Sequence, residues 1–137
     1  MRTILFDIDG TLLRLRGVGK RAMERAMADA CGVPHALDGV SFAGATDTLV
    51  AHTVAPERPT DEMWASYYGH LAAALAETQD TRPLRGVTEL LDALEARGAH
   101  LALLTGNLQR GAHLKLESVG MRERFDWDRS AFAEDGI

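Results

Sequence analysis

Two short apolar runs interrupt the mixed pattern of polar and apolar residues along the chain. The first is Thr3 to Asp7, and the second is "HLALL", residues 100–104. Apolar runs of this length, without polar alternation, are typical of strands that are buried on both faces of a sheet. We therefore predict one buried strand at the start of the chain and another near residue 100.

Between these runs, apolar residues recur at helical spacing. The pattern predicts helices in three segments: 20–33, Thr46 or Asp47 to His52, and 60–79. Thr60 is a good N-cap for the third segment, since threonine hydroxyls accept hydrogen bonds from the free amides of a first turn. The whole region from Arg14 to Arg82 is helical by its pattern.

A further helix is predicted directly before the second strand. Val87, Leu90, Leu91 and Leu94 form one apolar stripe, and Gly98 ends the helix. A strand, a helix and another strand in succession favour a parallel sheet, because parallel strands need a helical crossover. The expected fold class is therefore α/β, with the helical region inserted after the first strand.

Polar residues follow each predicted strand. Asp7 and Asp9 come after the first, and Thr105-Gly106-Asn107 comes after the second. Aspartate and glycine are also ordinary turn residues, so a purely structural role is the alternative. In parallel sheets, however, ligands bind at the carboxyl ends of the strands. The pattern thus indicates a functional site at this end of the sheet.

"FDIDGTLL" resembles the first motif of the haloacid dehalogenase-like (HAD) hydrolase superfamily, and "LLTGN" resembles the second. The resemblance covers most of the chain. It implies a Rossmann-like core formed by 1–13 and 83–137, with an inserted helical C1 cap, 14–82, as in phosphoglycolate phosphatases and β-phosphoglucomutases. "FAGATD" resembles a cap segment of the family in which Ala45 replaces a common arginine.

The same resemblance implies a mechanism. Asp7 would be the nucleophile that forms an aspartyl phosphate, and Asp9 would be the general acid and then the base. Two carboxylates repel a phosphate dianion unless a cation lies between them, and Mg²⁺ prefers hard oxygen ligands. The family pattern places Mg²⁺ on the Asp7 carboxylate and the Asp9 main-chain carbonyl, so Mg²⁺ is the expected cofactor.

Phosphate contacts are expected from the second motif and from one lysine. By the resemblance, Thr105 supplies a hydroxyl, and the loop amides of Gly106 and Asn107 cradle phosphoryl oxygens. Lys115 is the candidate cation; the alternative is a solvated lysine on a surface helix. Its helix has one apolar stripe, which consists of Leu108, Ala112, Lys115, Leu116 and Val119. A lysine inside such a stripe needs an anionic partner.

Composition and charge narrow the classes of function. The chain has 137 residues, a net charge of −5 and a pI near 5.5, so it has no general attraction for nucleic acid or anionic membranes. Cys31 is the only cysteine, which excludes an internal disulfide; we expect it to be a packing residue. The sequence contains no membrane-length apolar run, and a cytoplasmic location is the expectation.

For several other residues, the sequence gives less support for a functional role than it does for the two motifs. The five histidines show no metal-binding spacing and no acidic partner. Trp64, Tyr67, Tyr68 and Leu71 are expected to form the core of the cap, although one aromatic ring could line the cleft. Gly17-Val18-Gly19-Lys20 lacks the preceding strand and the full glycine spacing of a P-loop.

The acidic fourth motif of the family is missing. After Thr105 no apolar strand is followed by an acidic pair; residues 122–132 could hold one short strand. Asp126, Asp128 and Asp135 are expected to be turn or helix-start residues. The sequence is thus expected to be C-terminally truncated, which would leave Thr3 to Asp7 as an apolar sheet edge capable of self-association.

These features predict an Mg²⁺-dependent phosphatase that acts on a small phosphorylated metabolite. Dehalogenation is disfavoured, because Asp9 is a carboxylate that haloacid dehalogenases generally lack. A phosphomutase of the same fold is one alternative. A catalytically silent fragment or interaction module is another, and the physiological substrate is left open.

Overall fold

The structure is a computed structural model that describes residues 2–54, 60–78 and 80–136. Strands β1 (Thr3–Phe6) and β4 (His100–Leu103) pair in parallel, with Thr3 opposite His100 and Phe6 opposite Leu103. One further parallel bridge joins Leu104 to Ala131. Both predicted strands and the α/β fold class are therefore confirmed.

The two strands differ in burial. Leu101, Ala102 and Leu103 of β4 are buried, whereas β1 alternates between exposed and half-buried residues, and Leu5 is 50% exposed. The expectation that β1 is buried on both faces was therefore wrong. The cause is its place in the sheet: among the described residues, β4 is the only strand that pairs with β1.

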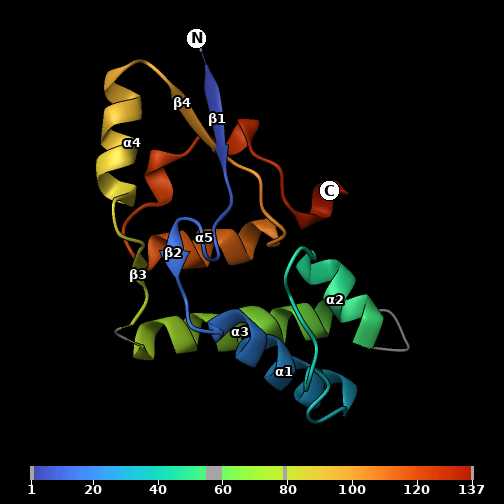
Figure 1. Ribbon diagram of the computed structural model, residues 1–137. Helices are drawn as coiled ribbons and strands as arrows, with labels where there is room; N and C mark the ends of the chain where they lie inside the picture. The colour runs from blue at the N-terminus through green and yellow to red at the C-terminus, as the bar shows by residue number, and fades with distance from the viewer. Residues whose placement is uncertain (1, 55–59, 79, 137) are drawn as a thin grey trace.

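Three helices lie between the strands in sequence: α1 (Val18–Cys31), α2 (Asp47–Val54) and α3 (Asp61–Glu77). The Met63 amide donates to Thr60 Oγ1 at 3.2 Å, which confirms the predicted cap of α3. The Leu49 amide donates to Thr46 Oγ1 at 3.1 Å at the start of α2. In Figure 1, α1 and α3 lie together below the sheet, and α2 lies to one side.

A short antiparallel pair brackets these helices. Strand β2 (Leu13–Arg14) pairs with β3 (Arg82–Pro83). The expectation of an entirely helical region from Arg14 to Arg82 was wrong at both of these ends. Strands of two residues are too short to show the two-residue alternation that identifies a strand in a sequence. This pair holds the chain entering the helical region beside the chain that leaves it.

Helices α4 (Val87–Ala96) and α5 (Gln109–Glu117) flank the sheet (Figure 1). Val87 and Leu91 of α4 are buried, but Leu90 is exposed, so the predicted stripe is narrower than expected. At about 100° per residue, Leu90 lies some 60° to one side of Val87, and Leu91 lies some 40° to the other. The buried arc of α4 is therefore centred between Val87 and Leu91.

The chain after α5 forms three short 3₁₀ helices: η1 (Arg122–Arg124), η2 (Trp127–Arg129) and η3 (Ala133–Asp135). Asp126 Oδ1 accepts from the Asp128 amide at 3.1 Å, and Asp135 Oδ2 accepts from the Phe132 amide at 2.8 Å. The prediction that Asp126, Asp128 and Asp135 are turn or helix-start residues is confirmed. The strand expected within 122–132 is reduced to the bridge at Ala131.

One continuous cluster of buried apolar residues joins the sheet side to the helical region. Its link is the contact of α3 with α5: a Cβ built on Gly111 would lie 3.7 Å from the Tyr67 hydroxyl and 3.8 Å from Leu71 Cδ2. An alanine at 111 would make ordinary van der Waals contact with α3, whereas a side chain that extends beyond Cβ would push α3 away. No helix among the described residues is long and apolar enough to span a membrane.

Candidate active site

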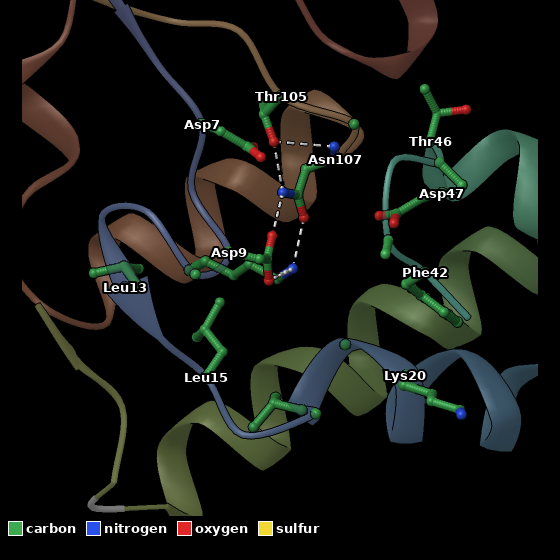
Figure 2. Close-up of a pocket in the computed structure, with 18 of the residues that line it drawn as sticks. Asp7, Asp9, Leu13, Leu15, Lys20, Phe42, Thr46, Asp47, Thr105 and Asn107 are labelled. Atoms are coloured by element: carbon green, nitrogen blue, oxygen red, sulfur yellow. Dashed lines mark hydrogen bonds and ion pairs between the residues drawn. The ribbon is translucent and has the colours of Figure 1, made fainter. Parts of the chain in front are cut away.

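A cavity of about 930 Å³ lies between the sheet and the helical region. Its floor is formed by the residues that follow β1 and β4, including Asp7, Asp9 and Thr105. Its opposite wall comes from the segment before and into α2, including Phe42, Thr46 and Asp47 (Figure 2). Residues nearly one hundred positions apart in sequence therefore face the same space.

Asp7 and Asp9 differ in their surroundings. Asp7 is exposed, and its Oδ1 accepts a hydrogen bond from the Ile8 amide at 2.7 Å. Asp9 is bonded through both carboxylate oxygens: Oδ1 accepts from Lys115 Nζ at 2.9 Å, and Oδ2 accepts from Asn107 Nδ2 at 2.6 Å. Asp7 is thus bonded to a backbone amide, while Asp9 is held by two side chains, Lys115 and Asn107.

Lys115 lies in the interior, as its position in the α5 stripe predicts. Its side chain is 3% exposed, and the neighbouring stripe residues Leu108, Ala112 and Leu116 are also buried. Besides Asp9, Lys115 Nζ donates to Asn107 Oδ1 at 2.6 Å. A buried ammonium group is costly unless it is paired, and the Asp9 carboxylate supplies that partner.

The loop after β4 is ordered by its own hydrogen bonds. Thr105 Oγ1 accepts from the Asn107 amide at 3.2 Å and from Asn107 Nδ2 at 2.7 Å. Because both bonds use Thr105 as the acceptor, its hydroxyl proton is left to donate elsewhere. Asn107, which we expected to contact phosphate, has its side chain committed to Thr105, Asp9 and Lys115 in this structure.

Electrostatics favour an ionised Asp9. Burial by itself raises the pKa of Asp9, but the Lys115 charge and the hydrogen bonds from Asn107 and Lys115 outweigh it, so the pKa lies below its usual value. The side chain is still 47% exposed, so solvent weakens this interaction. In the present arrangement Asp9 is a proton acceptor rather than a donor.

Asp47 is a site residue that the sequence analysis missed, because its position at a helix start explained it as a cap. It is 8% exposed and lines the cavity. Its amide donates to the Gly106 carbonyl at 2.8 Å, and Tyr67 OH donates to its Oδ2 at 3.4 Å. Burial raises the pKa of Asp47 to about 6; Asp9 adds to this rise, while Lys115, Tyr67 and the Leu108 amide oppose it.

The oxygen donors near Asp7 fit a magnesium ion as far as the described residues go. Asp7 is an exposed carboxylate with one oxygen bonded to a backbone amide, and Asp9 contributes a main-chain carbonyl at the same turn. The Asp9 carboxylate is already engaged by Lys115 and Asn107. Hard oxygen donors of this kind suit Mg²⁺.

Two minor expectations, for His70 and for Cys31, were wrong. His70 does have an acidic partner, because its Nε2 lies 2.7 Å from Asp29 Oδ2. Glu24, His35 and Asp38 place one ligand atom each within 4.8 Å of one another, although their sequence spacing gave no sign of it. Cys31 is exposed rather than packed. None of these residues lines the cavity that contains Asp7.

The sequence model of the haloacid dehalogenase-like hydrolase family matches residues 4–129. The chain therefore belongs to that family, as its motifs indicated. A comparison with curated proteins gives no significant match.

Solved structures share the fold. CbbY from Rhodobacter sphaeroides, determined with phosphate, is 20% identical with a TM-score of 0.75; the match covers 98% of this chain and 64% of CbbY. A predicted phosphoglycolate phosphatase from Haemophilus somnus is 20% identical, with a TM-score of 0.66 and the same coverage. A predicted β-phosphoglucomutase from Thermotoga maritima is 21% identical, with a TM-score of 0.58 and coverages of 98% and 62%. The chain thus spans less than two thirds of these proteins.

Proposed function

We propose that this protein is an Mg²⁺-dependent phosphatase that removes phosphate from a small phosphorylated metabolite through an aspartyl-phosphate intermediate. The observation that carries the proposal is the convergence of Asp7, Asp9, Thr105 and Lys115 at the carboxyl ends of β1 and β4, on one cavity. Family membership and the phosphate bound to CbbY support it.

The first step is attack by Asp7. A carboxylate oxygen of Asp7 bonds to phosphorus while the bond from phosphorus to the ester oxygen breaks. Negative charge on the phosphoryl oxygens is met by the Thr105 hydroxyl, the Gly106 amide and Lys115. The Asn107 amide, which donates to Thr105 Oγ1 in the present arrangement, would join them by exchanging that bond for one to the phosphate. The leaving alkoxide takes a proton from Asp9, which leaves an aspartyl phosphate and a free alcohol.

The second step returns Asp7 to its starting state. Asp9, now ionised, takes a proton from water, and the hydroxide attacks phosphorus and breaks its bond to Asp7. Inorganic phosphate leaves. The contacts from Lys115 and Asn107 that lower the pKa of Asp9 keep it unprotonated and therefore able to accept this proton.

The acid role of Asp9 requires a change of partners. Lys115 and Asn107 hold Asp9 ionised in the present arrangement. A phosphate dianion between them competes for the Lys115 ammonium and weakens its hold on Asp9, which raises the pKa of Asp9 toward the value that an acid needs. Substrate binding would therefore prepare the proton donor.

Magnesium would be held by the Asp7 carboxylate and the Asp9 main-chain carbonyl. When bound, it would neutralise part of the charge that the two aspartates and the phosphate share.

We further propose that the cap and core divide at β2 and β3, with 14–82 as the cap. The alternative phosphomutase would use the same pair and pass the phosphoryl group to a second substrate instead of water.

The Asp7→Asn variant tests the nucleophile. It should lose p-nitrophenyl phosphate hydrolysis, while Asp9→Asn should reduce it by about 10²–10⁴. Asp128→Asn, an exposed aspartate outside the cavity, is the matched control and should keep wild-type turnover. Near wild-type turnover by Asp7→Asn, with a circular dichroism spectrum like that of the parent protein, would remove Asp7 from its role.

A further inference from the structure

Asp47 is a buried carboxylate in the cavity that the proposed chemistry does not use. Its side chain points from the α2 side of the cavity toward the side that holds Asn107 and Asp9 (Figure 2). Among the described residues it forms no ion pair, and the groups that bond it are the Tyr67 hydroxyl and the Leu108 amide. The Lys115 ammonium donates to Asp9 and Asn107 instead. The direct hydrogen bonds to Asp47 therefore come from neutral donors, while the Lys115 charge acts on Asp47 without a hydrogen bond between them.

Asp47 is held against the loop that would bind phosphate. Its amide bonds to the Gly106 carbonyl at 2.8 Å. A Cβ built on Gly106 would lie 2.8 Å from the Ala45 carbonyl oxygen and 3.1 Å from Thr46 Cα. The Ala45-Thr46-Asp47 segment therefore lies against the Gly106 backbone, and the Asp47 carboxylate lines the same cavity as the proposed phosphate loop.

A fixed, buried carboxylate attracts hydrogen-bond donors and repels anions. A hydroxyl or ammonium group beside the ester would add one more hydrogen-bond donor to the Asp47 carboxylate. A carboxylate at the same place would lie near a like charge that no described ion pair neutralises. Tyr67 helps to hold the Asp47 carboxylate in place. Burial and the Asp47 and Asp9 charges raise the pKa of Tyr67 well above the usual value, so its hydroxyl stays a neutral donor.

We infer that Asp47 selects the organic part of the substrate: it admits phosphate monoesters that carry a hydrogen-bond donor next to the ester carbon and rejects those that carry a carboxylate there. This inference rests on the proposed function. It names alcohol, sugar or amino-alcohol phosphates as the substrate class, and it excludes 2-phosphoglycolate as a good substrate.

Three two-carbon phosphates of similar size test it: 2-hydroxyethyl phosphate, phosphoethanolamine and 2-phosphoglycolate. Their binding would be measured by calorimetry in the Asp7→Asn background, where they are not turned over, with inorganic phosphate as the reference ligand. The second protein carries Asp7→Asn with Asp47→Asn, which removes the charge and keeps the shape. Asp7→Asn with Asp38→Asn, an exposed cap aspartate, is the matched control, and Asp47→Ser is a second substitution.

With Asp47 present, the hydroxyl and ammonium ligands should bind about 10- to 100-fold more tightly than 2-phosphoglycolate. The Asp47→Asn and Asp47→Ser variants should reduce that ratio to within about threefold of one, and the control should leave it unchanged. Equal binding of all three ligands with Asp47 present, or a ratio that survives both substitutions, would overturn the inference and leave the proposed function standing. If inorganic phosphate and all three esters fail to bind, the proposed function falls, and this inference falls with it.

Discussion

The position of Lys115 in an apolar helix stripe was enough to predict that it has an anionic partner. It was expected inside the α5 stripe with an anionic partner, and the structure pairs it with Asp9 at 2.9 Å. Its role toward phosphate is still a proposal. A single ammonium group that faces both Asp9 and the cavity can bridge an acid and an anionic ligand, which an uncharged side chain cannot do.

The Lys115→Met variant tests that role. It should weaken inorganic phosphate binding by about tenfold or more, since a charge-assisted hydrogen bond is lost. Its melting temperature should change little, because methionine fills the buried volume and Asp9 is partly exposed to water. Calorimetry and thermal denaturation measure the two effects. Loss of stability with unchanged phosphate affinity would make Lys115 a structural residue.

Asp47 gives the protein a dependence on pH that can be worked out. Its pKa rises from 3.8 in the unfolded chain to about 6 in the folded protein. Between pH 3.8 and about 6, Asp47 is therefore mostly protonated in the folded state and mostly ionised in the unfolded state. The stabilisation that protonated Asp47 contributes to the folded state is fully present below pH 3.8 and is lost as the pH rises through about 6. The loss amounts to about 3 kcal/mol.

The Asp47→Asn variant should therefore be more stable than the parent protein at pH 7.5, and this advantage should disappear near pH 4. Urea unfolding at both pH values measures it, with Asp38→Asn as the control. An advantage of the same size at both values would show that burial of the Asp47 charge is not its cause.

At the scale of helices and strands, the sequence predicted the elements that have a pattern several residues long, and it missed the elements that are too short to have one. The strand runs at Thr3 and at "HLALL" and the α3 cap at Thr60 follow from patterns several residues long. Strands β2 and β3 have two residues each, so they leave no period to detect. Asp47 was missed because its burial depends on Gly106 and Tyr67, which are distant in sequence and close only in the fold.

The exposed edge of β1 has a testable consequence. Leu5 is 50% exposed on a strand whose other edge pairs with nothing in the described part of the chain. Such edges associate with one another, and a lysine on an edge strand prevents it. Leu5→Lys should reduce self-association, measured by light scattering across a range of protein concentrations. Leu49→Lys, on α2 and 57% exposed, is the control; an equal effect of both would point to general charge rather than the edge.

At the scale of the whole molecule, the site belongs to neither half alone. Asp7 and Lys115 come from the sheet side, while Asp47 and Tyr67 come from the helical region. The Asp47 amide and the Gly106 carbonyl join the two halves directly at the cavity. Any opening of the helical region must break that bond, so substrate entry and the environment of the site would be coupled.

The number of oxygen donors around Asp7 determines how tightly this molecule would hold Mg²⁺. Mg²⁺ favours near-octahedral oxygen coordination and gives up water reluctantly. The described residues offer it the Asp7 carboxylate and the Asp9 carbonyl, while the Asp9 carboxylate is bound by Lys115 and Asn107. The aspartates nearer the end of the described chain, Asp126 and Asp135, cap 3₁₀ helices instead. With these two protein ligands alone, water would supply most of the coordination.

We accordingly expect the 137-residue chain to bind Mg²⁺ weakly and to hydrolyse p-nitrophenyl phosphate slowly, with turnover that rises over a millimolar range of Mg²⁺. A magnesium titration of the activity, with Asp7→Asn as the blank, measures both. Half-maximal activity at micromolar Mg²⁺ would contradict this expectation and would mean that a further acidic ligand reaches Asp7.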